Sequence, residues 1–234
     1  MSWNQIVPSV SELHSAKRRA VLREAAQAFN RQGYHATTLE GVAKRLGITK
    51  TAIYHYFPNK NALLKACFDE VMDAAFANLA EATANGRNGR EKLRRVFAGY
   101  LTHLLDALTV AVVVLEDGAL APEDRRGAYA KRDRFERALR ALVEEGISDG
   151  SIVPCDPKLV IMALLGAVNW VPRWYRQDGE WSAEQLATGM SELLDRSIST
   201  QPPRSLVRRV KDIKAVGDGA RDATPRKPAK RKSP

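Results

Sequence analysis

Apolar residues recur every three or four positions along nearly the whole chain, and this period constrains the fold more than any other feature of the sequence. Residues with this spacing share one face of an α-helix. Two such stripes lie near the N-terminus: Leu22, Ala25, Ala26 and Phe29, followed by Leu39, Val42, Ala43 and Leu46. No alternation of apolar and polar residues long enough for a strand interrupts the pattern. The sequence therefore predicts an all-α fold of about nine helices.

Glycine, asparagine and proline mark where the predicted helices begin and end. Gly33, Gly47 and Pro58 separate the helices of the N-terminal part. The expected helices are one ending at about Gln32, then Leu39–Leu46, Thr49–Tyr56, Lys60–Ala84, Glu91–Leu108, Val110–Glu116, Glu123–Glu145, Pro157–Arg176 and Ala183–Ile198. Pro202 and Pro203 end the packed part, and the residues after them have the composition of a disordered segment.

The charge divides the chain into three segments. Residues 1–60 carry 9 Lys and Arg against 3 Asp and Glu, residues 61–200 carry 17 against 21, and residues 201–234 carry 11 against 3, which gives net charges of +6, −4 and +8. Basic segments favour a polyanionic partner, although a solvated surface would have the same charge. Together with the helix pattern, this division predicts domain boundaries at 1–58, 59–201 and 202–234.

Composition and motifs argue against several classes of protein. The chain is 44% hydrophobic and 27% charged, as in ordinary globular proteins, and its longest apolar run, Val110–Leu115, is much shorter than a membrane span. We expect no secretory signal, and two cysteines indicate a reduced, cytoplasmic setting. None of the four histidines has a metal-site spacing, and no nucleophile or phosphate-loop motif occurs. We therefore expect no catalytic residue, no metal and no cofactor.

Residues 37–60 combine two helix starts with a turn between them. Thr37 and Glu40 match the capping-box pattern T-x-x-E, which predicts a helix start at this point. Gly47 then supplies a turn, and Thr49 supplies a second N-cap before a short helix. This arrangement is typical of a helix-turn-helix, whose second helix enters the major groove of DNA.

The second short helix has two chemically different faces. One face can dock on the helices behind it and consists of Ala52, Ile53, Tyr56 and Phe57. The opposite face points outward with hydrogen-bonding groups and a cation, as a major groove requires, and consists of Lys50, Thr51, Tyr54 and His55. The candidate DNA contacts are these outward residues, the N-cap and three residues placed to contact phosphates: Thr38, Thr49, Lys50, Thr51, Tyr54, His55, Tyr56 and Lys60. By periodicity alone, a plain helical hairpin with incidental polar residues fits about equally well.

A family resemblance separates these two interpretations. The stretch TTLEGVAKRLGITKTAIYHYFPNK, residues 37–60, closely resembles the DNA-binding segment of TetR-family transcriptional regulators, and the preceding AAQAF and Gly33-Tyr34 match its first helix. Asn59 is a small departure from the usual Ser or Gly. The resemblance implies an N-terminal three-helix DNA-binding domain at 1–58, a ligand-binding and dimerisation domain at 59–201, and a homodimer that binds a pseudo-palindromic operator.

We call the predicted ligand-binding and dimerisation domain, residues 59–201, the body. Its most unusual segment runs from residue 163 to residue 179. Trp170 and Trp174 are four residues apart and share a face, while Asn169, Arg173 and Arg176 share another. Pro172 should kink this helix or end it early. The tryptophans suit core or dimer packing, and the arginines suit either a helix C-terminus or an anionic ligand.

A second resemblance bears on the ligand. The stretch GAVNWVPRWYR, residues 166–176, with Gly179 and SAEQLA at 182–187, is similar to the penultimate helix of TetR regulators of fatty-acid and steroid degradation that respond to acyl-coenzyme A thioesters. It implies an acyl-CoA effector with its acyl chain in the helical body and its phosphates against arginine. The candidate ligand contacts are Tyr100, His103, Asn169, Trp170, Arg173, Trp174 and Arg176.

The last two predicted helices, 157–176 and 183–198, are the expected dimer faces. Three alternatives stay open on the sequence: a TetR-type regulator of another small hydrophobic ligand, an architectural protein that binds DNA without sequence preference through the basic tail, and a helical small-molecule-binding protein or enzyme whose DNA motif is vestigial. The shared signature at 166–176 could also reflect dimer packing alone.

Overall fold

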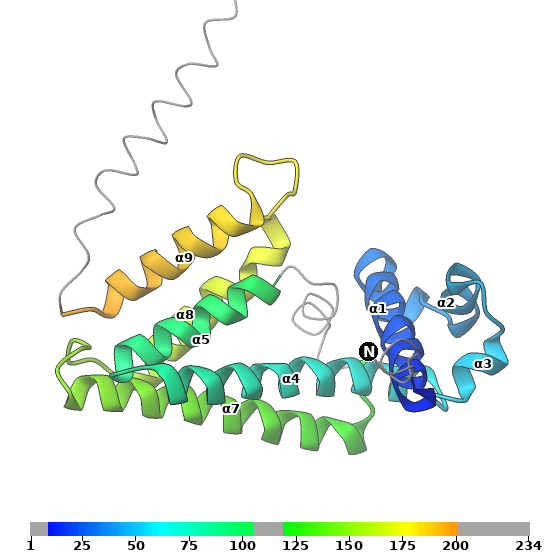
Figure 1. The fold of residues 1–234 in the computed structure, drawn as a ribbon, viewed down its shortest axis with the longest axis horizontal. Coiled ribbons are helices and arrows are strands. Elements are labelled where there is room, and N and C mark those ends of the chain that lie inside the picture. The colour runs from blue at the N-terminus through cyan, green and yellow to red at the C-terminus, as the bar shows by residue number, and fades with distance from the viewer. Residues whose placement is uncertain (1–8, 105–118, 201–234) are drawn as a thin grey trace, which may run out of the picture. The chain divides into compact units, whose positions relative to one another are not determined.

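The computed structural model describes residues 9–104 and 119–200, and within these ranges the chain is all-α, as predicted (Figure 1). One isolated bridge between Ile152 and Ser199 is the only β-type pairing in the described part. The described residues form eight helices: α1 (Val10–Ala36), α2 (Leu39–Leu46), α3 (Lys50–Tyr54), α4 (Lys60–Asn85), α5 (Gly89–His103), α7 (Pro122–Ser148), α8 (Pro157–Trp174) and α9 (Ala183–Ile198). The expected helix at 110–116 and the expected tail at 202–234 lie outside the described residues.

The predicted helix boundaries are mostly correct within one or two residues, and the exceptions have local causes. Gly33 interrupts α1 with φ 80° and ψ 165°, but the helical turn resumes and ends at Ala36. At its other end α1 begins at Val10, more than two turns before the apolar stripe. α3 is shorter than predicted, because the chain leaves the helix after Tyr54 in a turn in which Tyr56 and Phe57 donate to the Ile53 carbonyl.

The predicted capping box of Thr37 and Glu40 is wrong, because the cap lies one residue later. Thr38 is the N-cap of α2, and its hydroxyl accepts a hydrogen bond of 3.0 Å from the Gly41 amide. Thr37 is buried instead, with its hydroxyl donating to the Gly33 carbonyl over 2.8 Å. Glu40 pairs with Lys50 rather than with the cap. Only Thr37 has a glutamate three residues later; Thr38 has Gly41 at that position and therefore caps α2 without a reciprocal carboxylate bond.

Two hydrophobic clusters make up the core of the described ranges, 9–104 and 119–200. The first joins α1, α2, α3 and the start of α4, with Leu22, Ile53 and Leu63 fully buried. The second joins α5, α7, α8 and α9 around Leu93, Leu139 and other residues. α4 contributes to both clusters, and Figure 1 shows it lying alongside α7. The helix-turn-helix and the body are therefore both packed against α4, and α7 also reaches the first cluster through Ala128.

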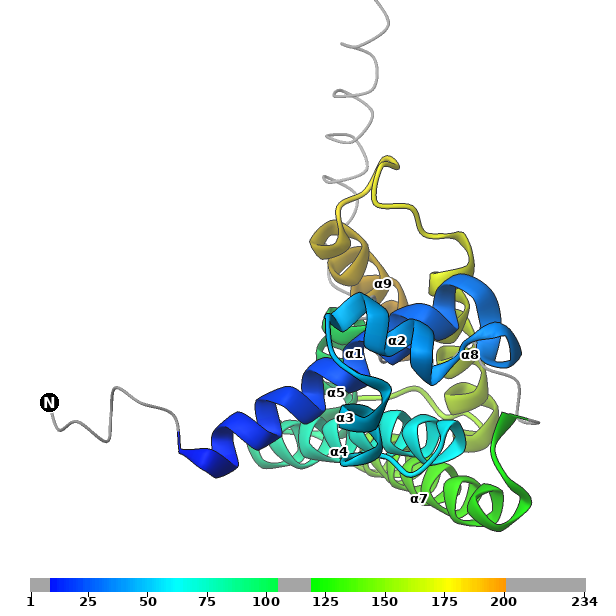
Figure 2. The same cartoon turned by 90° about the vertical axis from the view of Figure 1, so that its right-hand side faces the viewer.

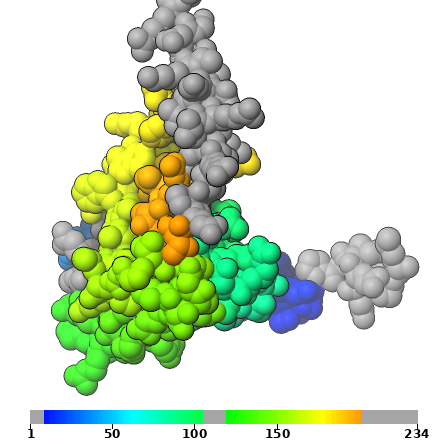
Figure 3. Space-filling model, turned by 90° about the vertical axis from the view of Figure 1, so that its left-hand side faces the viewer, coloured from blue at the N-terminus to red at the C-terminus, as the bar shows by residue number. Residues whose placement is uncertain are grey.

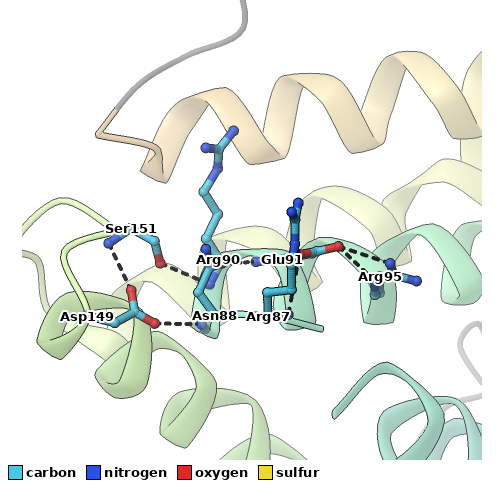
Figure 4. Close-up of polar contacts among 8 residues, drawn as sticks. Arg87, Asn88, Arg90, Glu91, Arg95, Asp149 and Ser151 are labelled. Atoms are coloured by element: carbon cyan, nitrogen blue, oxygen red, sulfur yellow. Dashed lines mark hydrogen bonds and ion pairs between the residues drawn. The ribbon is translucent and has the colours of Figure 1, made fainter. Parts of the chain in front are cut away.

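The beginning of α5 is fixed by hydrogen bonds from the end of α7 (Figure 4). The Asp149 carboxylate accepts from the Gly89 amide over 2.8 Å and from the Ser151 amide over 2.9 Å. The Ser151 hydroxyl in turn accepts from the Arg90 amide over 3.3 Å. These contacts satisfy two of the backbone donors that a helix leaves free at its N-terminus.

The end of α9 is attached to the same junction. Arg90 makes a bidentate ion pair with Asp195 of α9, with nitrogen–oxygen distances of 2.8 and 2.5 Å, and the Asp195 side chain is only 5% exposed. The Val153 amide also donates to the Ile198 carbonyl. In Figure 3 the end of α9 (orange) lies against the yellow-green residues of this segment. α9 is thus held to α5 and to the α7–α8 connection at its C-terminal end.

Candidate DNA-binding and effector sites

α3 is docked by one face and leaves the other accessible. Gly47 takes the left-handed conformation with φ 65°, which ends α2 and turns the chain, and the Thr49 hydroxyl then accepts from the Ala52 amide at the start of α3. Ile53 is fully buried and Phe57 is 3% exposed, so they anchor the segment to the first cluster. The opposite face carries exposed residues that were predicted as DNA contacts: Lys50, Thr51, Tyr54 and His55.

Lys50 and Tyr54 form one exposed unit on that face. The Lys50 ammonium lies 5.9 Å from the centre of the Tyr54 ring and is paired with the Glu40 carboxylate of α2. The hydrogen bond from Lys50 to Glu40 raises the pKa of Lys50, so the ammonium keeps its charge. Tyr54 is 45% exposed, and its position is set by the buried residue before it. A cation and a phenol are therefore presented together to a partner of α3.

Lys60, a predicted phosphate contact, makes hydrogen bonds within the protein. Its ammonium donates to three backbone carbonyls at the end of α1, those of Tyr34, His35 and Thr37, at 2.8, 3.1 and 2.9 Å. It also lies 4.4 Å from the centre of the Tyr34 ring. An ammonium has three donors, so all of them are occupied. Lys60 stabilises the end of α1 and thereby positions α2.

Three further predicted DNA contacts also have structural partners. The hydroxyls of Thr38 and Thr49 cap α2 and α3 as acceptors, which leaves their own donor hydrogens available to a phosphate. Tyr56 is half-buried, with its ring centre 4.8 Å from that of His14 in α1.

In the body, the structure brings two of the predicted ligand contacts together. The Tyr100 hydroxyl of α5 donates a hydrogen bond of 2.7 Å to the Asn169 side chain of α8. Burial raises the pKa of Tyr100 to about 12, so the phenol stays protonated and acts as the donor. His103, three residues further along α5, is exposed.

The aromatic and basic candidates of α8 lie on the surface instead of in the core. Trp170 is 62% exposed and Trp174 41%, because Val168 and Val171 occupy the buried face of the helix. The Arg173 guanidinium lies 5.8 Å from the centre of the Trp170 ring. Arg176 follows the end of the helix and is also exposed.

A further tryptophan that the periodicity could not place belongs to this region. Trp181, in the α8–α9 connection, meets Trp174 edge to face with ring centres 6.3 Å apart. Together with Tyr175, Arg176 and the intervening loop, these rings line a shallow, open hollow. The sequence does show Trp174 and Trp181 on either side of Gly179. Helical periodicity could not predict that they meet, because Trp174 ends a helix and Trp181 lies in a loop.

α8 also carries a continuous exposed apolar stripe. Its members are spaced by three, four and seven residues: Leu159, Met162, Ala163, Gly166, Ala167, Trp170 and Trp174. The middle of the stripe is small, and a Cβ built on Gly166 would meet no atom within 4 Å. In α9, Leu193 is 62% exposed. Small residues between large ones allow another helix to approach closely.

Neither a metal centre nor a membrane span emerges from the part of the chain described. Residues 9–104 and 119–200 contain no group of three His, Cys, Asp or Glu side chains that could hold a metal ion. No helix within those ranges is both long and apolar enough to cross a bilayer.

A helix-turn-helix with an exposed polar face, followed by a helical body, defines a DNA-binding transcriptional regulator. Residues 21–67 match the bacterial regulatory proteins of the tetR family, and residues 86–198 match the tetracyclin repressor-like C-terminal domain. The chain belongs to the TetR family. It is accordingly a ligand-responsive regulator that binds DNA, and not an enzyme.

The similar proteins include two of the branch that the sequence of α8 indicated, KstR2 and AibR, and a further TetR-family regulator, PfmR. The HTH-type transcriptional repressor KstR2 of Mycolicibacterium smegmatis is 25% identical over 185 residues, which are 77% of this chain and 90% of that protein. The regulator PfmR from Thermus thermophilus is 31% identical, with a TM-score of 0.68 over 75% of this chain and 97% of that one. AibR, solved with isovaleryl coenzyme A and operator DNA, is 26% identical, with a TM-score of 0.68 over 76% and 97%.

Proposed function

We propose that this regulator represses transcription as a homodimer bound to a pseudo-palindromic operator and is released by an acyl-CoA thioester. The observation that carries the proposal is the pairing of an exposed DNA-binding face on α3 with an arginine–tryptophan surface on α8. KstR2 is named a repressor, and AibR was solved with an acyl-CoA and operator DNA, which supports the same pair of ligands here. α4, shared by both clusters, connects the two sites.

The dimer in this proposal forms through the apolar stripe of α8 and the outer face of α9. An exposed row of leucine, methionine and tryptophan is costly in water, and a second copy would bury it in a four-helix bundle. The small residues at positions 163, 166 and 167 would lie at the closest approach of the two α8 helices. The two α3 helices would then lie on one side of the dimer and contact two half-sites.

Replacing Ala167 by glutamate is expected to convert the dimer into a monomer. A carboxylate at the closest approach would be buried without a partner in both copies, which costs several kcal/mol per ion. Light scattering after gel filtration measures the mass directly. The matched control is Ala130→Glu, at an exposed alanine of α7, which should stay dimeric. A dimer in both variants would rule out α8 as the interface.

The effector part of the proposal rests on the chemistry of a CoA thioester. Its phosphates require cations, and arginine binds phosphate through two parallel hydrogen bonds. Arg173 and Arg176 are exposed and have no carboxylate partner among the described residues. The half-buried Tyr100–Asn169 pair joins α5 to the same helix and could hydrogen-bond the amide or thioester groups. The acyl chain would enter the apolar second cluster.

Replacing Arg173 or Arg176 by alanine is expected to weaken release by acyl-CoA at least tenfold, with DNA affinity changed less than twofold. Thermal-shift titrations with acetyl-, isovaleryl- and octanoyl-CoA, with the free acids beside them, measure binding, and fluorescence anisotropy measures release from DNA. Arg94→Ala, at an exposed arginine of α5, is the control and should behave as the wild type. If no thioester stabilises the wild-type protein, the effector is another small hydrophobic ligand and the CoA proposal is wrong.

A further inference from the structure

We propose that the first turns of α1, residues 10–20, are a second DNA contact that binds the phosphate backbone beside each half-site through Lys17. We call these residues the α1 arm. The inference rests on the proposed DNA-binding role of α3. It adds a contact outside residues 21–67, the stretch that matches the family.

The α1 arm is a defined helix that extends beyond the hydrophobic core. The first buried residue of α1 is Val21, whereas Val10 is 87% exposed and Leu13 is 48% exposed. A capping box specifies the helix start: the Glu12 amide donates to the Ser9 hydroxyl, and the Glu12 carboxylate accepts from the Ser9 amide over 2.7 Å. Its helical form therefore has a local cause even though little of it is buried.

The α1 arm is attached to the end of the helix-turn-helix. The His14 ring lies 4.8 Å from the Tyr56 ring, and the Arg18 guanidinium lies 5.3 Å from the centre of the Phe57 ring. Both partners closely follow α3 in the sequence. Figure 2 shows the start of α1 (dark blue) continuing past α3 to one side. A duplex lying along α3 would therefore continue beside the α1 arm.

The two exposed cations of the α1 arm lie on different sides of the helix. Lys17 is seven residues before Glu24, so the two share a side, and Glu24 pairs with Arg45 of α2 over 3.7 Å. Lys17 therefore lies on the side of α1 that faces the helix-turn-helix. Arg19, two residues further on, lies on nearly the opposite side. Both are exposed and have no ion-pair partner among the described residues.

Charge complementarity identifies DNA as the partner of this side. The α1 arm contains one carboxylate, Glu12, and it is occupied by the helix cap. Lys17 is therefore a solvated cation next to a surface that already binds a polyanion. A lysine that contacts a phosphate adds affinity without sequence preference, and each such contact adds about 0.9 to the salt dependence of binding.

The test compares Lys17→Gln with Arg19→Gln, which remove the same charge from opposite sides of the α1 arm. Two duplexes are compared. The long one is a 40-bp sequence selected from a random pool for binding to the wild-type protein, and the short one is the same sequence trimmed to its two half-sites. We expect Lys17→Gln to lower affinity roughly five- to tenfold on the long duplex only, and its salt slope to fall by about 2 per dimer. Arg19→Gln should match the wild type on both.

Equal behaviour of the two variants, or an equal reduction in affinity by Lys17→Gln on both duplexes, would overturn the proposal. Both residues are exposed, so the variants should have the circular dichroism spectrum and melting temperature of the wild type. If the wild type does not prefer the selected duplex to a scrambled one, the proposed function itself is wrong. If it prefers the selected duplex but gains nothing from the flanks, only the contact by the α1 arm is wrong.

Discussion

Replacing Lys50 and Tyr54 together by alanine is expected to lower operator affinity at least 100-fold without changing the dimer or its melting temperature. The two side chains form the exposed unit of α3, and removing a side chain that reads a base costs about 1–3 kcal/mol. In a dimer this cost applies twice, once in each half-site. Fluorescence anisotropy with a labelled operator duplex measures the affinity, and gel filtration measures the dimer.

The matched control is Tyr129→Ala on α7, at a tyrosine of similar exposure, 39% against 45%. Removal of an exposed aromatic ring from the body should leave operator affinity within twofold of the wild type. If the double variant of α3 also stays within twofold, α3 does not bind the DNA and the assignment of its outward face is wrong.

Replacing Arg90 by methionine is expected to lower the free energy of unfolding by about 3 kcal/mol, the lower end of the range for breaking a buried ion pair. The variant leaves Asp195, whose side chain is 5% exposed, without its bidentate partner. The lower end is appropriate because the Arg90 side chain is 24% exposed, and water can reach it. The melting temperature should fall by roughly 6–12 °C, which differential scanning calorimetry measures.

Arg95→Met on the same helix provides the comparison. Arg95 also pairs with a carboxylate, that of Glu91, over 2.9 Å. Its side chain is 44% exposed, however, and its partner lies four residues earlier in the same helix. Exposed pairs of this kind contribute about 0.3–0.5 kcal/mol. Equal destabilisation in the two variants would mean that burial of Asp195 is unimportant and that the junction at the start of α5 does not fix α9.

The helices could be predicted closely because their causes are local. Asn59, Asp156 and Ser182 cap helices that begin at the predicted residue or next to it, and α9 has the predicted bounds, Ala183–Ile198. The helix-turn-helix was predictable for the same reason. Its buried anchor Ile53 and its exposed Lys50 and Tyr54 follow from a period of 3.6 residues.

Features that depend on residues distant in the sequence could not be predicted. Asp195 and Arg90 are 105 positions apart, and nothing in either helix indicates that they meet. Lys60 has the spacing of a phosphate contact, but nothing in its neighbourhood in the sequence indicates that its ammonium binds the carbonyls of Tyr34, His35 and Thr37, at the end of α1 and just after it.

The exposure of the α8 tryptophans shows a second limit of sequence reasoning. A period of four residues places Trp170 and Trp174 on one face but does not decide whether that face is covered within one chain or by a second copy. In a single chain the face is exposed, because Val168 and Val171 take the core positions. This surface of α8 combines tryptophans that can pack against a second copy with arginines that can bind an anion. The same residues therefore fit a sequence pattern for dimerisation and one for ligand binding.

Hydroxyl-radical footprinting on a selected operator tests most directly whether the outward faces of two α3 helices bind specific DNA as a pair. The account predicts two protected stretches on one side of the duplex, separated by a whole number of helical turns, and both absent in the double variant of Lys50 and Tyr54. Uniform protection that ignores sequence, disappears at moderate salt and persists in the double variant would contradict it, and would instead indicate non-specific binding through the basic C-terminal residues.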